Sequence, residues 1–403
     1  MDAPRTTNEP GRGGAGEVAF AFLRLGLVSF GGPAAHLGYF RKEFVERRRW
    51  LDDAAYADLV ALCQFLPGPA SSQVAFGLGL RRAGLTGALA AAAGFTLPSA
   101  AIMVLLGYGV AALTDVAHAG WLHGLRLAAA AVVAQAVLAM GRTLCPDLAR
   151  RLLALCVAVL AVLLAGPALQ VGVIAACALV GVWAFRDAGP RPAESPGAPG
   201  GHRWAAGSLV AYAVLLAGLP LLAGLTGSRP LAVFGGFYHA GALVFGGGHV
   251  VLPLLRAEVV PPGWISDERF LAGYGAAQAL PGPLFSFAAY LGTVIHGAPR
   301  AWVGGLSALI ALFLPGWLLV GGAYPFWHRL GVRGWARAAL RGANAAVVGL
   351  LLAALYSPVC TESVRTLGDA AAALLGLLLL ERFRVPAWAL VAALAALGQW
   401  VLR

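Results

Sequence analysis

Long apolar stretches make up almost the whole chain, and they constrain its fold more than any other feature. Most are close to the roughly 20 residues that a helix needs to cross the hydrocarbon core of a bilayer. Six precede a polar loop and seven follow it: 17–39, 54–78, 84–114, 119–140, 148–165, 166–185, 204–226, 231–255, 268–293, 301–323, 335–357, 367–380 and 386–402. The pattern predicts an all-α polytopic membrane protein.

The composition excludes a water-soluble globule. Only 12% of the 403 residues are charged and 60% are hydrophobic, whereas soluble domains carry roughly 25% charged residues. The net charge of +11 comes from arginines, most of them in short loops between apolar stretches, where positive residues mark the cytoplasmic side of a membrane protein. We therefore expect a lipid bilayer as the environment and no nucleic-acid partner.

Polar stretches divide the chain into four parts. Residues 1–16 form a polar, Gly-rich tail without the apolar core of a signal peptide. An N-terminal repeat is predicted over 17–185, followed by a cytoplasmic linker over 186–203 that contains the Pro/Gly-rich run PRPAESPGAPG. The remaining residues, 204–403, form a second repeat.

Four apolar segments contain residues that an α-helix cannot easily accommodate. Gly-rich breaks interrupt 17–39 and 231–255, and Pro-Gly-Pro breaks interrupt 54–78 and 268–293. A Pro-Gly-Pro run lacks two N–H donors and contains a flexible Gly, so it cannot remain helical. Inside a membrane, such breaks persist only where protein or a wet cavity satisfies the freed backbone groups.

The broken segments of the two halves are copies of each other. At a spacing of 215 residues, the matching positions are Phe22/Phe237, Arg24/His239, Gly26/Gly241, Phe30/Phe245, Gly31/Gly246, Gly32/Gly247 and Glu43/Glu258. At a spacing of 214, they are Trp50/Trp264, Asp53/Asp267, Gln64/Gln278, Leu66/Leu280, Pro67/Pro281, Gly68/Gly282, Pro69/Pro283 and Ser72/Ser286. Apolar composition alone would not align Trp, Gln and Pro-Gly-Pro, so the chain contains an internal duplication.

Loop charge indicates how the broken segments lie in the membrane. As re-entrant hairpins, they would leave about nine full spans plus four broken segments, and they would place the basic cluster at 41–49 in the cytoplasm. If all segments cross, there are up to thirteen spans. We favour the first arrangement. Either way, an odd number of crossings separates the two copies, which predicts inverted-topology repeats, an architecture of secondary transporters.

The broken segments supply the candidate substrate-binding residues. Backbone N–H groups and the positive helix ends at a break suit an anion, and a cation such as Arg24 inside an apolar segment is costly unless it has a function. The matched glutamines and nearby hydroxyls offer further hydrogen bonds. The candidates are Arg24, Ser29, Gly31, Gly32, Gln64, Pro67, Gly68, Pro69, Ser72, His239, Gly246, Gly247, Gln278, Pro281, Gly282 and Pro283.

Other polar residues fit less specific roles. His36 and His249 lie close to the Gly breaks at different offsets, and they are candidates for a proton relay. Arg126 is a second arginine within an apolar segment, and we expect it to have no partner in the repeat. Asp53 and Asp267 follow Trp in polar loops, which is the pattern of a helix cap.

Several functions are excluded or disfavoured. Lys42 is the only lysine, so the chain has no GxxxxGK[ST] nucleotide-binding loop, and it has no HExxH or GxSxG motif. The five cysteines form no CxxC pair or Cys/His cluster. We expect a protein that is not an enzyme and that needs no metal or other cofactor.

Four phrases in this order resemble the chromate ion transporter family in its long, two-domain form. They are FGGPAAHLG at 30–38, QFLPGPA at 64–70, FGGGHVVLPLL at 245–255 and QALPGPL at 278–284. The resemblance spans about residues 18–402. It implies potential- or ion-gradient-driven efflux of chromate across the inner membrane of a bacterium, chromate resistance, and competition by sulfate. It also implies roles for Arg24, Gly31, Gly32, Gln64, 67–69, Gly246, Gly247 and 281–283.

Two alternatives remain open. Sulfate has the same shape and charge as chromate, so the chain could transport sulfate or another oxyanion inward. A different class of function would be an intramembrane enzyme or a lipid flippase with the breaks as its active site. The sequence leaves homo-oligomerisation open.

Overall fold

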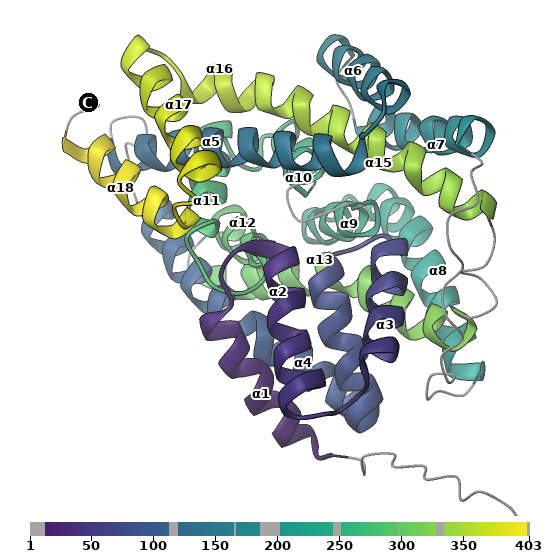
Figure 1. Ribbon diagram of the computed structural model, residues 1–403. Coiled ribbons are helices and arrows are strands. Elements are labelled where there is room, and N and C mark those ends of the chain that lie inside the picture. Colours follow the sequence, from purple (N-terminus) through teal and green to yellow (C-terminus); the bar gives the residue numbers. More distant parts are fainter. Residues whose placement is uncertain are drawn as a thin grey trace, which may run out of the picture.

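The computed structural model describes residues 13–112, 120–164, 167–185, 202–244, 251–297, 299–327 and 334–400, and every element in this part of the chain is helical (Figure 1). The first half contains α1 (Ala15–Val28), α2 (Gly32–Phe40), α3 (Asp53–Phe65), α4 (Ala70–Ala111), α5 (Gly120–Leu144), α6 (Leu148–Leu163) and α7 (Pro167–Ala184). The second contains α8 (His202–Thr226), α9 (Arg229–Ala242), α10 (Val251–Val259), α11 (Asp267–Ala277), α12 (Phe287–His296), α13 (Ala301–Ala323), α15 (Gly334–Ala354), α16 (Thr361–Ser363), α17 (Leu367–Arg382) and α18 (Ala387–Trp400).

Among the residues that the structure describes, five helices are long and apolar enough to cross a membrane. They are Ala70–Ala111, Gly120–Leu144, Trp204–Thr226, Ala301–Phe326 and Arg337–Ser363, and shorter apolar helices occupy Gly172–Ala184, Leu284–His296 and Ala387–Trp400. Large apolar side chains along α8, such as Leu221 and Leu225, are exposed on the surface. Lipid covers such a surface at no cost, so the structure confirms the prediction of an all-α polytopic membrane protein.

The predicted helix breaks occur where the structure describes them. α1 ends at Val28 and α2 begins at Gly32, with Gly31 in the left-handed region at φ = 100°. The first Pro-Gly-Pro separates α3 from α4, and the second separates α11 from a short 3-10 turn, Leu284–Ser286, that leads into α12. The Gly-rich break at 246–248 lies outside the described residues.

In the first half, the two helices that flank each break, α1 with α2 and α3 with the part of α4 before its kink, begin and end on the same side of the molecule. Glu17, at the start of α1, accepts a hydrogen bond from Arg82 Nη2 (3.2 Å) and another from Trp50 Nε1 (3.2 Å). Its carboxylate also forms an ion pair with Arg48 at 3.6 Å. The start of α1, the loop after α2 and the residues before the kink of α4 at Ala83 and Gly84 are therefore neighbours. Each pair forms a helical hairpin with its break at the tip.

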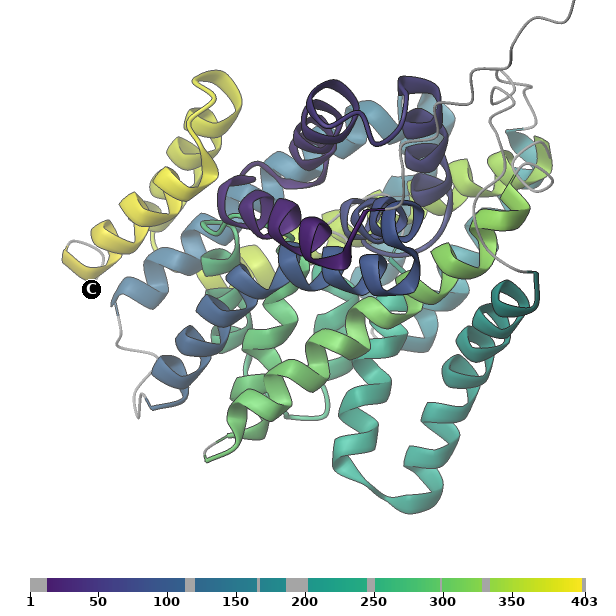
Figure 2. The ribbon, with the colours of Figure 1, turned by 90° about the horizontal axis from the view of Figure 1, so that it is seen from below.

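The part of α4 beyond the kink runs antiparallel to α13, and the two long helices pack against each other (Figure 2). At one end, the backbone N–H of Trp302 donates to the hydroxyl of Tyr108 at 3.1 Å. At the other, Trp327 Nε1 donates to Asp58 Oδ1 at 2.8 Å. The two ends of this helix pair therefore lie at opposite faces of the molecule. We call the face near Arg82 and the end of α13 the Arg82 face, and the face near Tyr108 and the start of α13 the Trp302 face.

In each half, an equivalent Arg–Asp ion pair stabilises the loop between the two broken segments. Arg41 Nε donates to Asp53 Oδ1 at 2.8 Å, and Arg256 Nε donates to Asp267 Oδ1 at 2.6 Å. The prediction that these two aspartates cap helices is wrong by one residue. The side chains of Asp52 and Ser266 cap α3 and α11, which leaves the aspartates free to pair with arginine.

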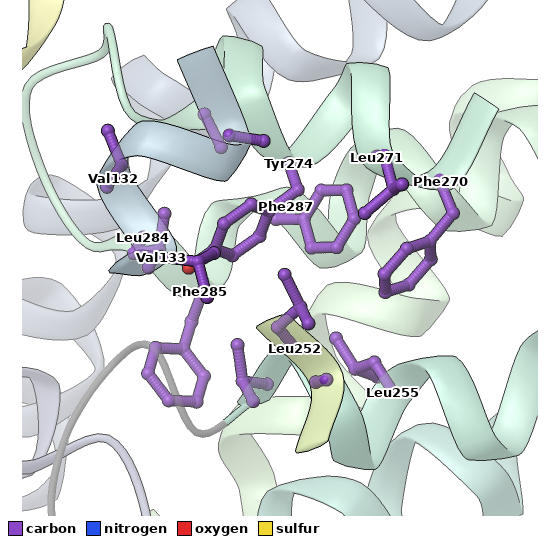
Figure 3. Packing of buried hydrophobic residues seen from close by; sticks show 14 of the residues in the cluster. Val132, Val133, Leu252, Leu255, Phe270, Leu271, Tyr274, Leu284, Phe285 and Phe287 are labelled. Carbon is purple, nitrogen blue, oxygen red and sulfur yellow. The ribbon is translucent and has the colours of Figure 1, made fainter. Parts of the chain in front are cut away.

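Aromatic and aliphatic side chains fill the centre of the molecule around α11. Phe270, Leu271 and Tyr274 of α11 pack with Leu252 of α10 and Phe287 of α12 (Figure 3), and all five are at most 1% exposed. Close packing of this kind replaces the hydrophobic driving force that is missing between helices in lipid. It anchors α11, and with it the second Pro-Gly-Pro, against α10 and α12 in this structure.

The hairpin arrangement predicts a labelling pattern. In a variant without the five native cysteines, a cysteine replacing Arg49 and one replacing Thr86 should react with an impermeant maleimide from the same side of the membrane, because both positions lie on the Arg82 face. A cysteine replacing Arg300, next to Trp302, should react only from the opposite side. Labelling of positions 49 and 86 from different sides would contradict the arrangement.

Candidate functional site

Two backbone hydrogen bonds join the breaks of one half to those of the other. Gly68 N–H donates to the carbonyl of Val244 at 2.7 Å, and Gly282 N–H donates to the carbonyl of Ser29 at 2.8 Å. Ser29 and Val244 occupy matching places, each directly before a Phe-Gly-Gly sequence. A buried N–H without an acceptor is costly in a membrane, so each Pro-Gly-Pro is completed by the other half of the chain.

Glycine is required at the centre of each Pro-Gly-Pro for two reasons. Gly68 and Gly282 have φ angles of +128° and +90°, which residues with a Cβ rarely adopt. A Cβ on Gly282 would lie 3.1 Å from Ser99 Oγ and 3.3 Å from the carbonyl of Gly26, and a Cβ on Gly68 would lie 3.2 Å from Gly316 Cα. The breaks therefore pack directly against α1, α4 and α13.

His36 supports the first Gly break. Its Nε2 lies 3.2 Å from the carbonyl oxygen of Ser29, and its Nδ1 lies 3.3 Å from Ser71 Oγ. Because a carbonyl can only accept, Nε2 carries the proton and Nδ1 accepts from the serine hydroxyl. The Ser29 carbonyl thus accepts from both His36 and Gly282, and both ring nitrogens of His36 are engaged.

A cavity of about 330 Å³ lies where the first Gly break meets the second Pro-Gly-Pro. Polar groups from four parts of the chain reach it, namely the backbone at Gly31 and Gly32, Gln135 of α5, Gln278 at the end of α11, and Arg384 between α17 and α18. Its other lining residues are Pro33, Val132, Ala277, Leu280, Gly282, Leu284, Leu380, Val385, Pro386 and Ala387. Small size, backbone groups, amides and one cation are features of a site for a small anion.

The polar groups of the cavity are available for a ligand. Gln278 Nε2 is buried, and it has no hydrogen-bond partner among the described residues. Arg384 is exposed and has a left-handed backbone conformation, with φ = 53°. An amide donor without a partner and a cation at the mouth can each donate to the oxygens of an oxyanion.

The structure places several other predicted residues away from this cavity. Arg24 lies on the exposed side of α1, next to Leu23 and Leu27. Its counterpart, His239, bonds through Nδ1 to Glu258 Oε1 at 2.6 Å. Gln64 is exposed at the end of α3.

Ser29 and Ser72 are buried, and their hydroxyls have no hydrogen-bond partner in the described part of the chain. Pro67, Pro69, Pro281 and Pro283 flank the two glycines of the backbone bonds. Gly246, Gly247 and His249 lie outside the described residues. In the ranges that the structure describes, no group of His, Cys, Asp and Glu could hold a metal ion.

Sequence reasoning missed Gln135 and Arg384, because neither belongs to a broken segment and Leu350 occupies the place that matches Gln135. The interpretation that Arg126 has no counterpart is wrong. Residues 125–133, LRLAAAAVV, recur at the 215-residue spacing as LRGANAAVV at 340–348, which pairs Arg126 with Arg341. A comparison of the apolar segments beyond the breaks would have found this pair.

Comparisons with known proteins show which family the chain resembles. A family profile described as "Chromate transporter" matches the chain twice, over residues 16–182 and 231–399. A chromate transport protein of Cupriavidus metallidurans is 29% identical over 94% of this chain and 91% of its own length. A chromate transport protein of Pseudomonas aeruginosa is 29% identical over 73% of this chain and 69% of its own length. A probable chromate transport protein of Synechococcus elongatus is 28% identical over 94% of both. No solved structure matches the chain.

The break geometry predicts the effect of adding one methyl group. Gly282→Ala combines an unfavourable φ with contacts to Ser99 and Gly26, so we expect it to lower the free energy of unfolding by about 2 kcal/mol or more and to impair function. Gly227→Ala is the matched control, since φ is +61° there and a Cβ would meet nothing within 4 Å. Thermal unfolding in detergent measures both. Equal effects would show that close packing at the break is unimportant.

Proposed function

Since the chain belongs to the chromate transporter family, we propose that it is a secondary transporter that exports chromate across the inner membrane of a bacterium. The observation that carries this proposal is the cavity at the break, which offers amide, backbone and arginine donors to a small oxyanion. Chromate resistance is the expected physiological result. The family is one of transporters rather than enzymes, and the chain is a multi-pass membrane protein.

The membrane potential suffices to drive this export. Moving one charge through about 100 mV corresponds to about 2.3 kcal/mol, so a dianion leaving an inside-negative cell releases about 4.6 kcal/mol. That corresponds to a concentration ratio of more than three orders of magnitude. Uptake of the same ion would need cotransported cations or protons.

We place the Arg82 face in the cytoplasm, because residues 41–49 on that face include five basic and two acidic side chains, and basic loops mark the cytoplasmic side. Arg142 at the end of α5 forms an ion pair with Glu381 near the end of α17, and Arg384 follows two residues after α17. We propose that Arg384 stands at the cytoplasmic mouth of the cavity and admits the anion to Gln278, Gln135 and the Gly31–Gly32 backbone.

We further propose that residues 17–185 and 204–403 act as two inverted repeats that alternate around the breaks. The paired bonds of Gly68 and Gly282, and the paired loops of Asp53 and Asp267, support this proposal. Gln64 and the first Pro-Gly-Pro are proposed to take part in binding in the opposite state, as Gln278 and the second Pro-Gly-Pro do in this one. Arg24 and His239, on the hairpin helices that lead to the breaks, are proposed to contact the anion on its way.

The function is tested in inside-out vesicles that contain the protein. With an imposed potential, positive inside the vesicles, we expect chromate accumulation that an excess of sulfate reduces. Vesicles without the protein are the control, and reversal of the potential should abolish accumulation. Folded, inserted protein that accumulates no chromate would contradict export and would favour inward transport of sulfate.

The cavity predicts a difference between two neighbouring arginines. Arg384→Gln removes the cation at the mouth, so we expect the chromate concentration for half-maximal transport to rise about tenfold, the effect of losing one charge-assisted hydrogen bond. Arg382→Gln makes the same change in charge two residues earlier, at a position that does not line the cavity, and should behave as wild type. Similar effects of the two variants would assign Arg384 a general electrostatic role instead.

A further inference from the structure

A second polar cluster lies away from the cavity, where α5, α11 and the start of α17 meet. Its centre is Arg126, a fully buried arginine that is 1% exposed. Two of its nitrogen atoms, Nε and Nη1, have no hydrogen-bond partner among the described residues. A guanidinium with two such nitrogen atoms is costly within a membrane protein.

Within the described part of the chain, the hydrogen bond of Arg126 depends on the protonation of His123. Arg126 Nη2 lies 3.4 Å from His123 Nδ1, and His123 Nε2 lies 2.7 Å from Asp369 Oδ1. Because arginine can only donate, Nδ1 accepts, and Nε2 carries the single proton of a neutral imidazole. A second proton, on His123 Nδ1, would place an N–H donor opposite the Nη2 donor of Arg126, and the two could no longer form a hydrogen bond.

Asp369 is a fixed anchor for His123. Its Oδ2 accepts hydrogen bonds from the backbone N–H groups of Arg365 at 3.0 Å and Thr366 at 2.9 Å, as part of the capping box of α17. Its side chain is 3% exposed. A doubly protonated His123 therefore keeps its bond to Asp369, and Arg126 is the group that must move.

Glu268 offers Arg126 an alternative partner. Its Oε1 lies 3.9 Å from Arg126 Nη1, and it now accepts a hydrogen bond from Arg365 Nη2 at 3.2 Å. The charged groups that face Arg126 are Glu268 on α11, Glu362 on α16, Asp369 on α17 and Arg365 before it. With neutral His123, three carboxylates stand against two arginines, so the cluster carries a net negative charge that one proton would balance.

Glu268 connects this cluster to the cavity. It lies in the first turn of α11, and Gln278 follows the last residue of the same helix. α11 also packs tightly on α5, since a Cβ on Gly275 would overlap the backbone of Leu125. A change at Glu268 is therefore carried by one short rigid helix to the amide that lines the cavity.

We propose that His123 and Asp369 form a proton-binding site that controls the position of α11. A proton from the outer aqueous phase binds His123 Nδ1, Arg126 leaves His123 and moves closer to Glu268 than the present 3.9 Å, and the tightened ion pair holds the start of α11. The cluster opens to the surface through Arg365 and Glu268, whose side chains are 47% and 30% exposed. The inference rests on the proposed orientation, in which this end of α5 faces outward.

Transport tests the site in inside-out vesicles, whose lumen corresponds to the outside. At a clamped potential, we expect the initial rate of chromate uptake by the wild type to differ about threefold or more between lumenal pH of about 5.5 and about 7.5, the range in which histidine titrates. His123→Gln keeps an acceptor for Arg126 and a donor for Asp369 but cannot gain a proton, so its rate should not depend on lumenal pH. His296→Gln, an exposed histidine on the Trp302 face, should retain the dependence.

A second measurement needs no chromate. Amide hydrogen exchange of residues 267–277, corrected for intrinsic rates, should slow several-fold in the wild type as pH falls, because the Arg126–Glu268 pair tightens. His123→Gln and Glu268→Gln should each remove this change. pH-dependent protection in His123→Gln would overturn the inference, as would pH-independent protection in the wild type. Chromate transport without any lumenal pH dependence would overturn the proton-site inference and leave the proposed function intact. Loss of transport together with pH-dependent protection of residues 267–277 would contradict only the proposed function.

Discussion

The whole arrangement depends on the need to satisfy backbone N–H and C=O groups where helices stop inside a membrane. Water is absent there, so each freed group must find a partner within the protein. Gly282 finds it at Ser29 and Gly68 at Val244, and in both cases donor and acceptor come from different halves. Neither half can therefore complete its own Pro-Gly-Pro, and the two must fold around each other.

The same constraint explains why small residues gather around the breaks. Gly26 lies against the carbonyls of Gly94 and Phe95, and Gly241 lies against that of Leu312, so backbone meets backbone with no side chain between. Because a Pro-Gly-Pro has few atoms with which to fill space, a cavity remains beside it. Gln278, Gln135 and Arg384 make this cavity polar, and that polarity distinguishes it from a packing defect.

Sequence reasoning predicted the features that depend on the local chain. The two Pro-Gly-Pro runs and the Gly31-Gly32-Pro33 run each separate two helices, so the breaks next to Gly31, Gly68 and Gly282 could be placed without a structure. Which side chains reach a break depends on how helices from distant parts of the chain pack. Arg384 is about a hundred residues from Gln278 in sequence, and no local pattern connects them. Arg24 shows the same limit. The sequence places it a few residues before the first Gly break, but it does not show that Arg24 lies on the exposed face of α1.

The two halves match closely at the breaks but differ in the residues around them. Leu350 stands where Gln135 lines the cavity, and Ala338 stands where His123 meets Arg126. Arg341, the counterpart of Arg126, donates instead to the carbonyl of Phe185 at 3.2 Å, an acceptor that does not titrate. If the halves were identical, the inward-open and outward-open states would be equivalent by symmetry and would respond alike to pH and to an anion. His123 and Gln135, which occur in only one half, remove that equivalence.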